Sequence, residues 1–287
     1  MRLDHLEYPL GGYIYPLNGY YLPGFSGCQL SRTMATPESE SFVRTFARGL
    51  KVIEVMGTGA SRQTLGEVAG SVDLPRTAVR RFLMTLIDLG FVRTDGKQYW
   101  LTPRVLRLGM SYLSTLPYWR QAQLALEELC ASIGQSCALS VLDGEDIVYI
   151  QRHHAKRILP MSPSLGSRLP AHAVSMGRVL LAGLSDEELQ AYLAHASFKK
   201  LTAATLVDPN VLEAKIKQAR AEGYAWIDRE LDESICGLSV PVRDKDGATI
   251  AAINVSLSAG MFNESAAISA FLSELQSTAS QLRAASM

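Results

Sequence analysis

Cysteine is scarce in this sequence, and long apolar runs are missing from it. The four cysteines, Cys28, Cys130, Cys137 and Cys236, lie far apart and form no CxxC pair. This spacing argues against a disulfide framework and against a structural zinc site. The sequence also lacks any run of about eighteen apolar residues that could span a bilayer. We therefore expect a cytoplasmic protein with free thiols and no membrane partner.

The charge is unevenly distributed along the chain, although its formal total is zero. Residues 41–108 contain 11 lysines and arginines against 5 acidic residues, whereas residues 109–287 contain 15 against 19. A nucleic-acid-binding protein needs only a local positive surface, so overall neutrality does not exclude one. The pattern predicts a basic domain joined to a mildly acidic domain, in a chain long enough for both.

The first forty residues are rich in Gly, Pro and Tyr and show neither a helical nor a strand period. They also lack the basic start and the apolar core of a signal peptide. We expect residues 1–40 to be a disordered extension. Because Met34 opens a stretch that would serve as an N-terminus, the sequence leaves open whether Met1 or Met34 is the native start.

Residues 42–102 have the pattern of a helix-turn-helix followed by a hairpin. Apolar residues recur at helical spacing from 42 to 56, from 64 to 69 and from 75 to 89, which predicts three short helices. Gly57 and Gly90 are placed to end the first and third helices, and Pro75 suits the first position of the third. The following FVRTDGKQYWLT reads as two strands around an Asp95-Gly96 turn, which predicts a wing.

The predicted third helix has one apolar face and one polar, basic face. Its apolar face carries Val79, Phe82, Leu83, Leu86 and Leu89. Its polar face carries Arg76, Thr77, Arg80, Arg81 and Thr85. Since arginine can bridge a guanine edge bidentately, this face suits a recognition helix in the major groove of double-stranded DNA. The alternative is an amphipathic helix whose polar face only contacts solvent. The neighbouring short helix and the predicted wing favour the recognition helix instead.

Contacts to the DNA backbone are expected on both sides of this helix. The candidates are Arg62, Gln63 and Thr64 at the start of the second helix, and Arg93 and Lys97 on the wing.

Beyond the wing, the chain alternates between helical and strand patterns. Residues 103–133 are helical with an interruption at Pro117, and we expect them to link two domains. From residue 134 onward, CALSVL and DIVYIQR form one predicted hairpin and SVPVRDKDGATIAAINVSL a second. Helices are predicted over 174–184, from a capping box at Ser185, from 208 to 223, and from Glu264 to the C-terminus. The expected fold class is α+β, with one sheet in the second domain.

Two stretches in combination resemble the IclR family of transcription regulators: TFARGLKVIEVM through DLGFVRTDGKQYWLT, and GSRLPAHAVSMGRVLLAGLSDEEL. The likeness covers about residues 42–285 and is strongest to the PcaR/PcaU/PobR branch, which controls aromatic-acid catabolism. It implies a winged helix-turn-helix at 42–102, a GAF-like α/β effector-binding domain at 134–287, homodimers or homotetramers, and palindromic operators. It also implies activation or repression under a small carboxylate effector of the protocatechuate, 4-hydroxybenzoate or β-ketoadipate type.

Candidate effector-binding residues follow from both the local pattern and this resemblance. The first amides of the helix at Ser175 and Met176 could hold a carboxylate, and Arg168 could add positive charge. The resemblance adds Asn254 and Ser256, which are two apart in a strand and therefore share one sheet face. We expect Met161, Leu169 and Ile253 to supply apolar cover. The alternatives are a surface cation at Arg168 and solvent-side strand residues at 254 and 256.

Metal, cofactor and catalytic roles find little support in the sequence. His153 and His154 are adjacent and would face opposite sides of a strand, while His172 and His195 have no partner at ligand spacing. Nothing resembling a nucleophile elbow surrounds Cys236. We expect no cofactor and no enzyme activity. The remaining alternatives are an IclR-type regulator that answers to an aliphatic acid, and a redox-sensing or catalytic GAF-like protein.

Overall fold

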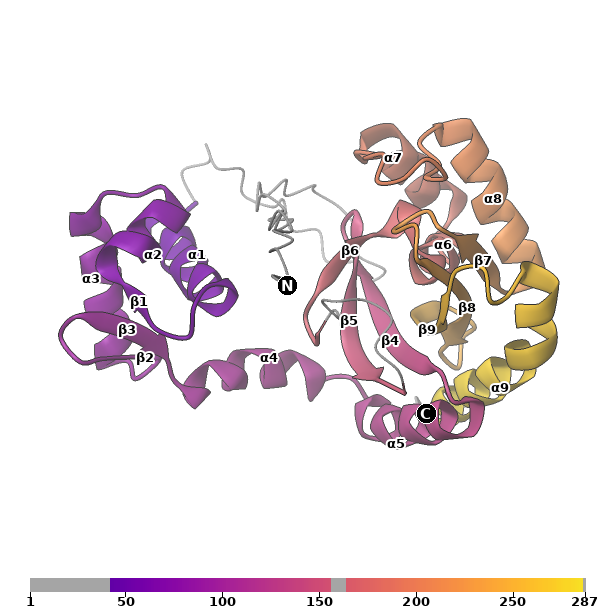
Figure 1. Cartoon of the computed structure of the whole chain (residues 1–287), viewed down its shortest axis with the longest axis horizontal. Coiled ribbons are helices and arrows are strands. Elements are labelled where there is room, and N and C mark those ends of the chain that lie inside the picture. Colours follow the sequence, from indigo (N-terminus) through magenta and orange to yellow (C-terminus); the bar gives the residue numbers. More distant parts are fainter. Residues whose placement is uncertain (1–41, 156–163, 286–287) are drawn as a thin grey trace, which may run out of the picture. The chain divides into compact units, whose positions relative to one another are not determined.

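The computed structural model describes residues 42–155 and 164–285 of the chain (Figure 1). The expected disordered extension at 1–40, the candidate start Met34 and the candidate pocket residue Met161 lie outside these residues. Among the described residues, no helix combines the length and the apolar character that a membrane crossing requires.

The N-terminal domain contains three helices and a small antiparallel sheet. Its elements are α1 (Arg44–Thr58), β1 (Gln63–Thr64), α2 (Leu65–Val72), α3 (Arg76–Asp88), β2 (Val92–Thr94) and β3 (Gln98–Leu101). The strands pair in the order β1-β3-β2. Val52, Val68, Leu83 and Val92 bring all three helices and the wing into one core. The predicted winged helix-turn-helix is therefore present.

Local sequence signals place the ends of these helices. Thr64 and Glu67 form a reciprocal capping box at the start of α2. Asp73 ends α2 in the left-handed conformation. Pro75 precedes α3 as its N-cap, one residue earlier than predicted. In the wing, Gly96 has a φ of 92°, and this positive value suits glycine at the hairpin turn.

The segment that follows the wing contains two helices with different surroundings. After a short 3-10 turn η1 (Pro103–Val105) come α4 (Leu106–Leu113) and α5 (Trp119–Ile133). Most of α4 is exposed, but α5 buries Trp119, Leu126 and Leu129 in the core of the C-terminal domain. The predicted linker at 103–133 therefore includes a helix that belongs to that core by its packing.

The C-terminal domain is built on a six-stranded antiparallel sheet with the order β6-β5-β4-β9-β8-β7. The strands are β4 (Ser136–Asp143), β5 (Asp146–His153), β6 (Arg168–Pro170), β7 (Ala225–Asp228), β8 (Ile235–Arg243) and β9 (Thr249–Ser258). The four central strands match the two predicted hairpins. The edge strands β6 and β7 were not predicted, because three- and four-residue segments carry too little alternation to be recognised.

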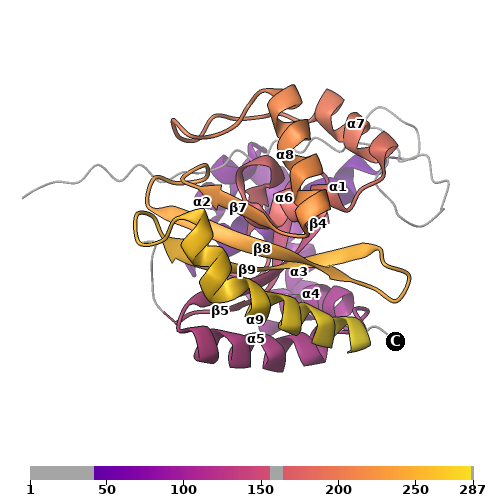
Figure 2. The same cartoon turned by 90° about the vertical axis from the view of Figure 1, so that its right-hand side faces the viewer.

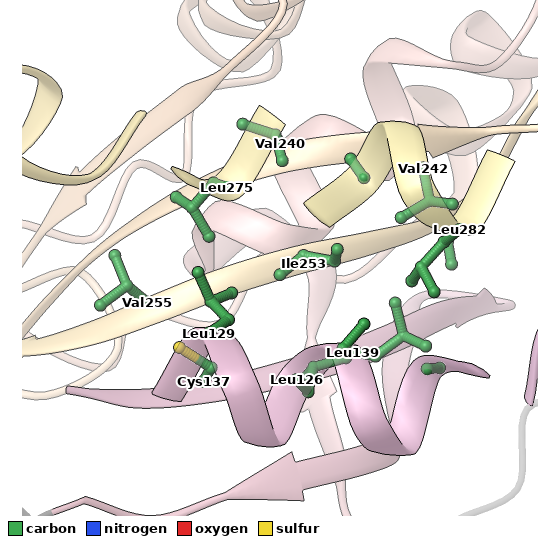
Figure 3. Close-up of a cluster of buried hydrophobic side chains, with 14 of the residues drawn as sticks. Leu126, Leu129, Cys137, Leu139, Val240, Val242, Ile253, Val255, Leu275 and Leu282 are labelled. Atoms are coloured by element: carbon green, nitrogen blue, oxygen red, sulfur yellow. The ribbon is translucent and has the colours of Figure 1, made fainter. Parts of the chain in front are cut away.

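Helices cover both faces of this sheet (Figure 2). The remaining elements are η2 (Ala171–Ala173), α6 (Ser175–Ala182), α7 (Asp186–His195), α8 (Pro209–Glu222) and α9 (Glu264–Ala285). On one face, α5 and α9 enclose an apolar core with Leu139, Val240 and Ile253 (Figure 3). On the other face, α6 packs against the sheet, and α8 packs outside α6. The predicted capping box at Ser185 and Glu188 is confirmed at the start of α7.

Candidate DNA-binding surface and ligand pocket

The polar face of α3 is exposed as its sequence predicts, but Leu89 of the predicted apolar face is 50% exposed and is the C-cap of the helix. Val79, Leu83 and Leu86 are buried, and the polar set Arg76, Thr77, Arg80, Arg81 and Thr85 is exposed. The hydroxyl of Thr85 donates to the carbonyl of Arg81 within the helix. The guanidinium of Arg76 lies over Gly66, where a Cβ would be 2.9 Å from Nη2. The arginines thus form an exposed cationic surface whose own helix is fixed by its apolar face.

The residues that flank α3 divide into free and committed side chains. Arg93 and Lys97 are exposed on the wing. Arg62 stacks over the ring of Trp100 at 4.1 Å and pairs with Asp95 at 3.6 Å, so it braces the wing against the start of α2. The hydroxyl of Thr64 belongs to the α2 capping box.

Gln63 requires a correction, because the structure does not place it on the surface. Its side chain is only 5% exposed. Nε2 donates to the carbonyls of Met56 and Ala60 at 3.2 and 3.1 Å. Gln63 therefore ties the end of α1 to β1 and does not present its amide to DNA.

Arg168 also requires a correction. Its guanidinium pairs with Asp143 and, at 3.0 Å, with Asp146 on the β4–β5 hairpin, and it donates to the Asp143 carbonyl as well. Burial is the largest single influence and lowers the pKa of Arg168, but the hydrogen bonds and charges of Asp143 and Asp146 together outweigh it and raise the pKa. Arg168 is therefore a surface cation, which is the alternative given by the sequence. It does not line the pocket.

The pocket lies between α6 and the sheet face that α6 covers, and its volume is about 50 Å³. Four predicted residues, Ser175, Met176, Asn254 and Ser256, meet there. Leu169 also lines it, whereas Ile253 points to the opposite face, into the core with α5 and α9. The remaining lining residues are Tyr149, Arg152, Ala173, Val174, Ile227, Leu231, Ile235, Cys236 and Gly237.

Hydrogen bonds fix the polar side chains of this pocket. The hydroxyls of Ser175 and Ser239 are 2.7 Å apart, which holds the start of α6 on β8. Asn254 Nδ2 donates to Ser256 Oγ at 3.0 Å, but Asn254 Oδ1 is buried without a partner among the described residues. Val174, which precedes α6, has no polar side chain to cap its first amides. The pocket thus offers both free acceptors and free donors.

Arg152 is a pocket residue that sequence analysis missed. It lies on β5 with its guanidinium carbon 5.2 Å from the centre of the Tyr149 ring. Residues 149 and 152 are three apart and would face opposite sides of a regular strand. The register of β4 with β5 shifts here, since Leu139 pairs with Gln151 and Ser140 with Tyr149, leaving Ile150 unpaired. This bulge turns both Tyr149 and Arg152 toward the pocket.

Burial alters the titration of two side chains at the pocket. It raises the pKa of the Tyr149 phenol, against the smaller effects of the Arg152 charge and hydrogen bond, so the hydroxyl stays protonated at neutral pH. Burial likewise raises the pKa of the Cys236 thiol to about 11. A protonated, buried thiol is a poor nucleophile, which argues against a redox or catalytic role for Cys236. Within residues 42–155 and 164–285, no cluster of three potential metal ligands occurs.

A winged helix-turn-helix joined to a domain with a pocket is the architecture of a ligand-responsive, DNA-binding transcription regulator. Residues 45–96 match the family model described as "IclR helix-turn-helix domain", and residues 110–284 match "Bacterial transcriptional regulator IclR C-terminal". The chain belongs to the IclR family. It is a transcription regulator and not an enzyme, as the sequence predicts.

Two curated relatives identify the branch of the family. The chain is 37% identical to the Pca regulon regulatory protein of Pseudomonas putida, over 87% of this chain and 86% of that protein. It is 34% identical to the p-hydroxybenzoate hydroxylase transcriptional activator of Acinetobacter baylyi, over 85% of this chain and 92% of that one. The predicted PcaR/PobR branch of the family is confirmed.

Solved structures agree with this assignment. A putative transcriptional regulator from Rhodococcus sp. RHA1 is 42% identical with a TM-score of 0.76, over 85% of this chain and 98% of that chain. The inducer-binding domain of an Acinetobacter PobR double mutant, in complex with 3-hydroxybenzoic acid, is 31% identical with a TM-score of 0.53. That similarity covers 57% of this chain and 96% of that domain.

Proposed function

We propose that an aromatic hydroxy acid of the protocatechuate or 4-hydroxybenzoate type binds in the pocket and controls the binding of this regulator to a palindromic operator. The observation that carries this proposal is the convergence of Arg152, the first amides of α6 and Asn254 on one small cavity. Relatives that act on p-hydroxybenzoate hydroxylase expression or bind 3-hydroxybenzoic acid support the choice of ligand class.

A buried carboxylate needs several donors, because desolvating an unpaired charge is costly. Arg152 supplies a guanidinium, and the amides at Ser175 and Met176 add the positive end of the α6 dipole. The unpartnered Oδ1 of Asn254 would accept a hydrogen bond from a ligand hydroxyl. Leu169 and Ile227 provide apolar walls for a ring.

An aliphatic acid is the second candidate, and the size of the cavity favours it. About 50 Å³ is well below the volume of usual ligand pockets, so a ring requires the walls to move further than a short acid such as pyruvate or glyoxylate does. β-Ketoadipate lies between these classes, since it has two carboxylates and no ring.

Calorimetry on the full chain distinguishes these ligands, with 4-hydroxybenzoate, protocatechuate, β-ketoadipate, pyruvate and glyoxylate titrated in turn. Arg152→Gln should weaken binding of the true effector about tenfold or more, because it removes a charged hydrogen-bond donor. Arg168→Ala is the matched control, since its guanidinium is committed to surface carboxylates. Equal losses in the two variants, or none in Arg152→Gln, would contradict the proposed ligand geometry.

Ser256→Leu tests a second strand, β9, that lines the same pocket. Ser256 is partly exposed and hydrogen-bonded to Asn254, so a larger apolar side chain there would fill the ligand space and disturb the amide. We expect this variant to lose the effector response in an operator-binding assay while its effector-free affinity for DNA stays unchanged. Effector affinity retained within a few-fold would place the binding site elsewhere.

We also propose that the chain acts as a homodimer or homotetramer. Exposed apolar side chains support this, since Phe46 on α1 is 67% exposed and Leu106 on α4 is 66% exposed. A palindromic operator would then present half-sites about 34 Å apart, or a multiple of this distance, to two recognition helices. Light scattering during size-exclusion chromatography tests the proposal, because a lone chain has a mass of 31.3 kDa.

A further inference from the structure

A buried ion pair lies beside the pocket but outside the set of residues that line it. Arg178 on α6 and Glu230 in the loop after β7 have side chains that are only 4% and 8% exposed. Nη1 of Arg178 donates to Oε1 of Glu230 and Nη2 donates to Oε2, each at 3.1 Å. This bidentate geometry is the strongest form of an arginine–carboxylate contact.

Each member of the pair belongs to a segment that forms one wall of the pocket. Arg178 follows Ser175 by about one helical turn, and its Nη2 also donates to the carbonyl of His172 at 2.9 Å. Glu230 lies between two pocket residues, Ile227 and Leu231. The ion pair therefore connects the α6 wall to the β7–β8 wall.

A third segment, residues 199–206, closes the network around Glu230. The Thr205 hydroxyl donates to the Glu230 carbonyl at 2.6 Å, and the amide of Leu206 donates to Oε2 of Glu230 at 3.3 Å. The ring of His172 contacts the carbonyl of Lys199 through Nε2 at 3.1 Å. Both charged groups are thus held by contacts from several segments of the chain.

We infer that the Arg178–Glu230 ion pair is a positioning element that holds the two pocket walls at the spacing the effector requires. The inference rests on the proposed role of this pocket as the effector site. A purely stabilising role would predict something different, because a well-packed apolar pair of similar volume often replaces a buried ion pair without loss of stability. In a positioning role, by contrast, an apolar pair cannot replace the hydrogen bonds by which the guanidinium connects the two walls.

The test uses four variants of the full chain. Glu230→Gln and Arg178→Lys keep the size of the side chains but lose the bidentate contact. The double variant R178M/E230L removes both charges together, so it leaves no unpaired buried charge. Asp186→Asn is the control, because it removes a carboxylate from an arginine contact that lies away from the pocket, at Arg220.

Two readouts are measured on every variant. Calorimetry with 4-hydroxybenzoate gives ligand affinity, which should fall roughly three- to thirtyfold in all three pocket-wall variants and stay unchanged in Asp186→Asn. Amide hydrogen exchange is measured by mass spectrometry in the absence of ligand. In the three pocket-wall variants it should accelerate in peptides 171–182 and 227–236. Peptides from α9 report global opening, so in the double variant, which leaves no unpaired buried charge, they should exchange at the wild-type rate.

The double variant separates positioning from stability. We expect its melting temperature to return toward the wild-type value, while its ligand affinity stays low and the wall peptides continue to exchange rapidly. Recovery of wild-type wall exchange in this variant would overturn the inference, as would acceleration of α9 in step with the walls. If the wild-type chain binds no 4-hydroxybenzoate, the proposed ligand is wrong, and the exchange measurement still decides the role of the ion pair.

Discussion

Gly177 on α6 is the position where a single methyl group should have the largest effect on the pocket. A Cβ at this residue would lie 2.1 Å from the carbonyl oxygen of Ala171 and 2.4 Å from its Cα. Ordinary contact begins at about 3.4 Å, so Gly177→Ala leaves a shortfall of about 1.3 Å against the backbone of η2. Because backbone cannot rotate away as a side chain can, α6 and η2 must separate.

The cost follows from this overlap. Overpacking a buried site typically costs about 1–3 kcal/mol, and a clash with backbone belongs at the upper end. At about 2–4 °C per kcal/mol for a domain of this size, the melting temperature should fall by roughly 6–12 °C. The same separation moves Ser175 and Met176, so effector affinity should fall as well.

Differential scanning calorimetry of the full chain measures this change in the transition of the C-terminal domain. Gly70→Ala is the control, since Gly70 is exposed in α2 and a Cβ there meets nothing within 4 Å. That substitution should stabilise its own domain by about 0.5–1 kcal/mol. A melting temperature of Gly177→Ala within a degree or two of the wild-type value would refute the steric reasoning.

Three further predictions concern DNA binding, folding and pH. Arg80→Ala should cost about 1–3 kcal/mol of binding free energy at the cognate operator in an anisotropy titration. Lys97→Ala should instead weaken binding to all DNA sequences equally and flatten its salt dependence. A sequence-dependent loss of affinity in Lys97→Ala would contradict its role as a phosphate contact. Gln63→Ala should destabilise the N-terminal domain by about 1–3 kcal/mol in denaturant titrations, since it leaves buried carbonyls unpaired. Burial lowers the pKa of His172 below its unfolded value, so the folded chain resists protonation there. The contribution of neutral His172 to the free energy of unfolding is therefore fully present above about pH 6.5, and it declines as the pH falls toward the lowered pKa. His172→Gln should reduce that decline in thermal melts.

Local sequence patterns determined the DNA-binding domain and the ends of most helices. The capping boxes at Thr64 and Ser185 and the Asp95-Gly96 turn are made by residues within four positions of each other, so their geometry is visible in the sequence. The exposed arginines of α3 follow from helical periodicity alone. Residues 175–176 are indicated by a helix start and by the family resemblance. Residues 254 and 256 come from the resemblance, and strand alternation places them on one sheet face.

Only the tertiary structure decided which charged and polar side chains face the pocket. Arg168 pairs with carboxylates on a hairpin more than twenty residues away. Gln63 is buried, and its amide donates to a carbonyl near the end of α1. Arg152 reaches the pocket through a bulge that depends on how β5 pairs with β4. Arg178 and Glu230 meet across 52 positions of the sequence. Pairing of this kind depends on strand register and helix packing, which are set by the whole core and leave no local period in the chain.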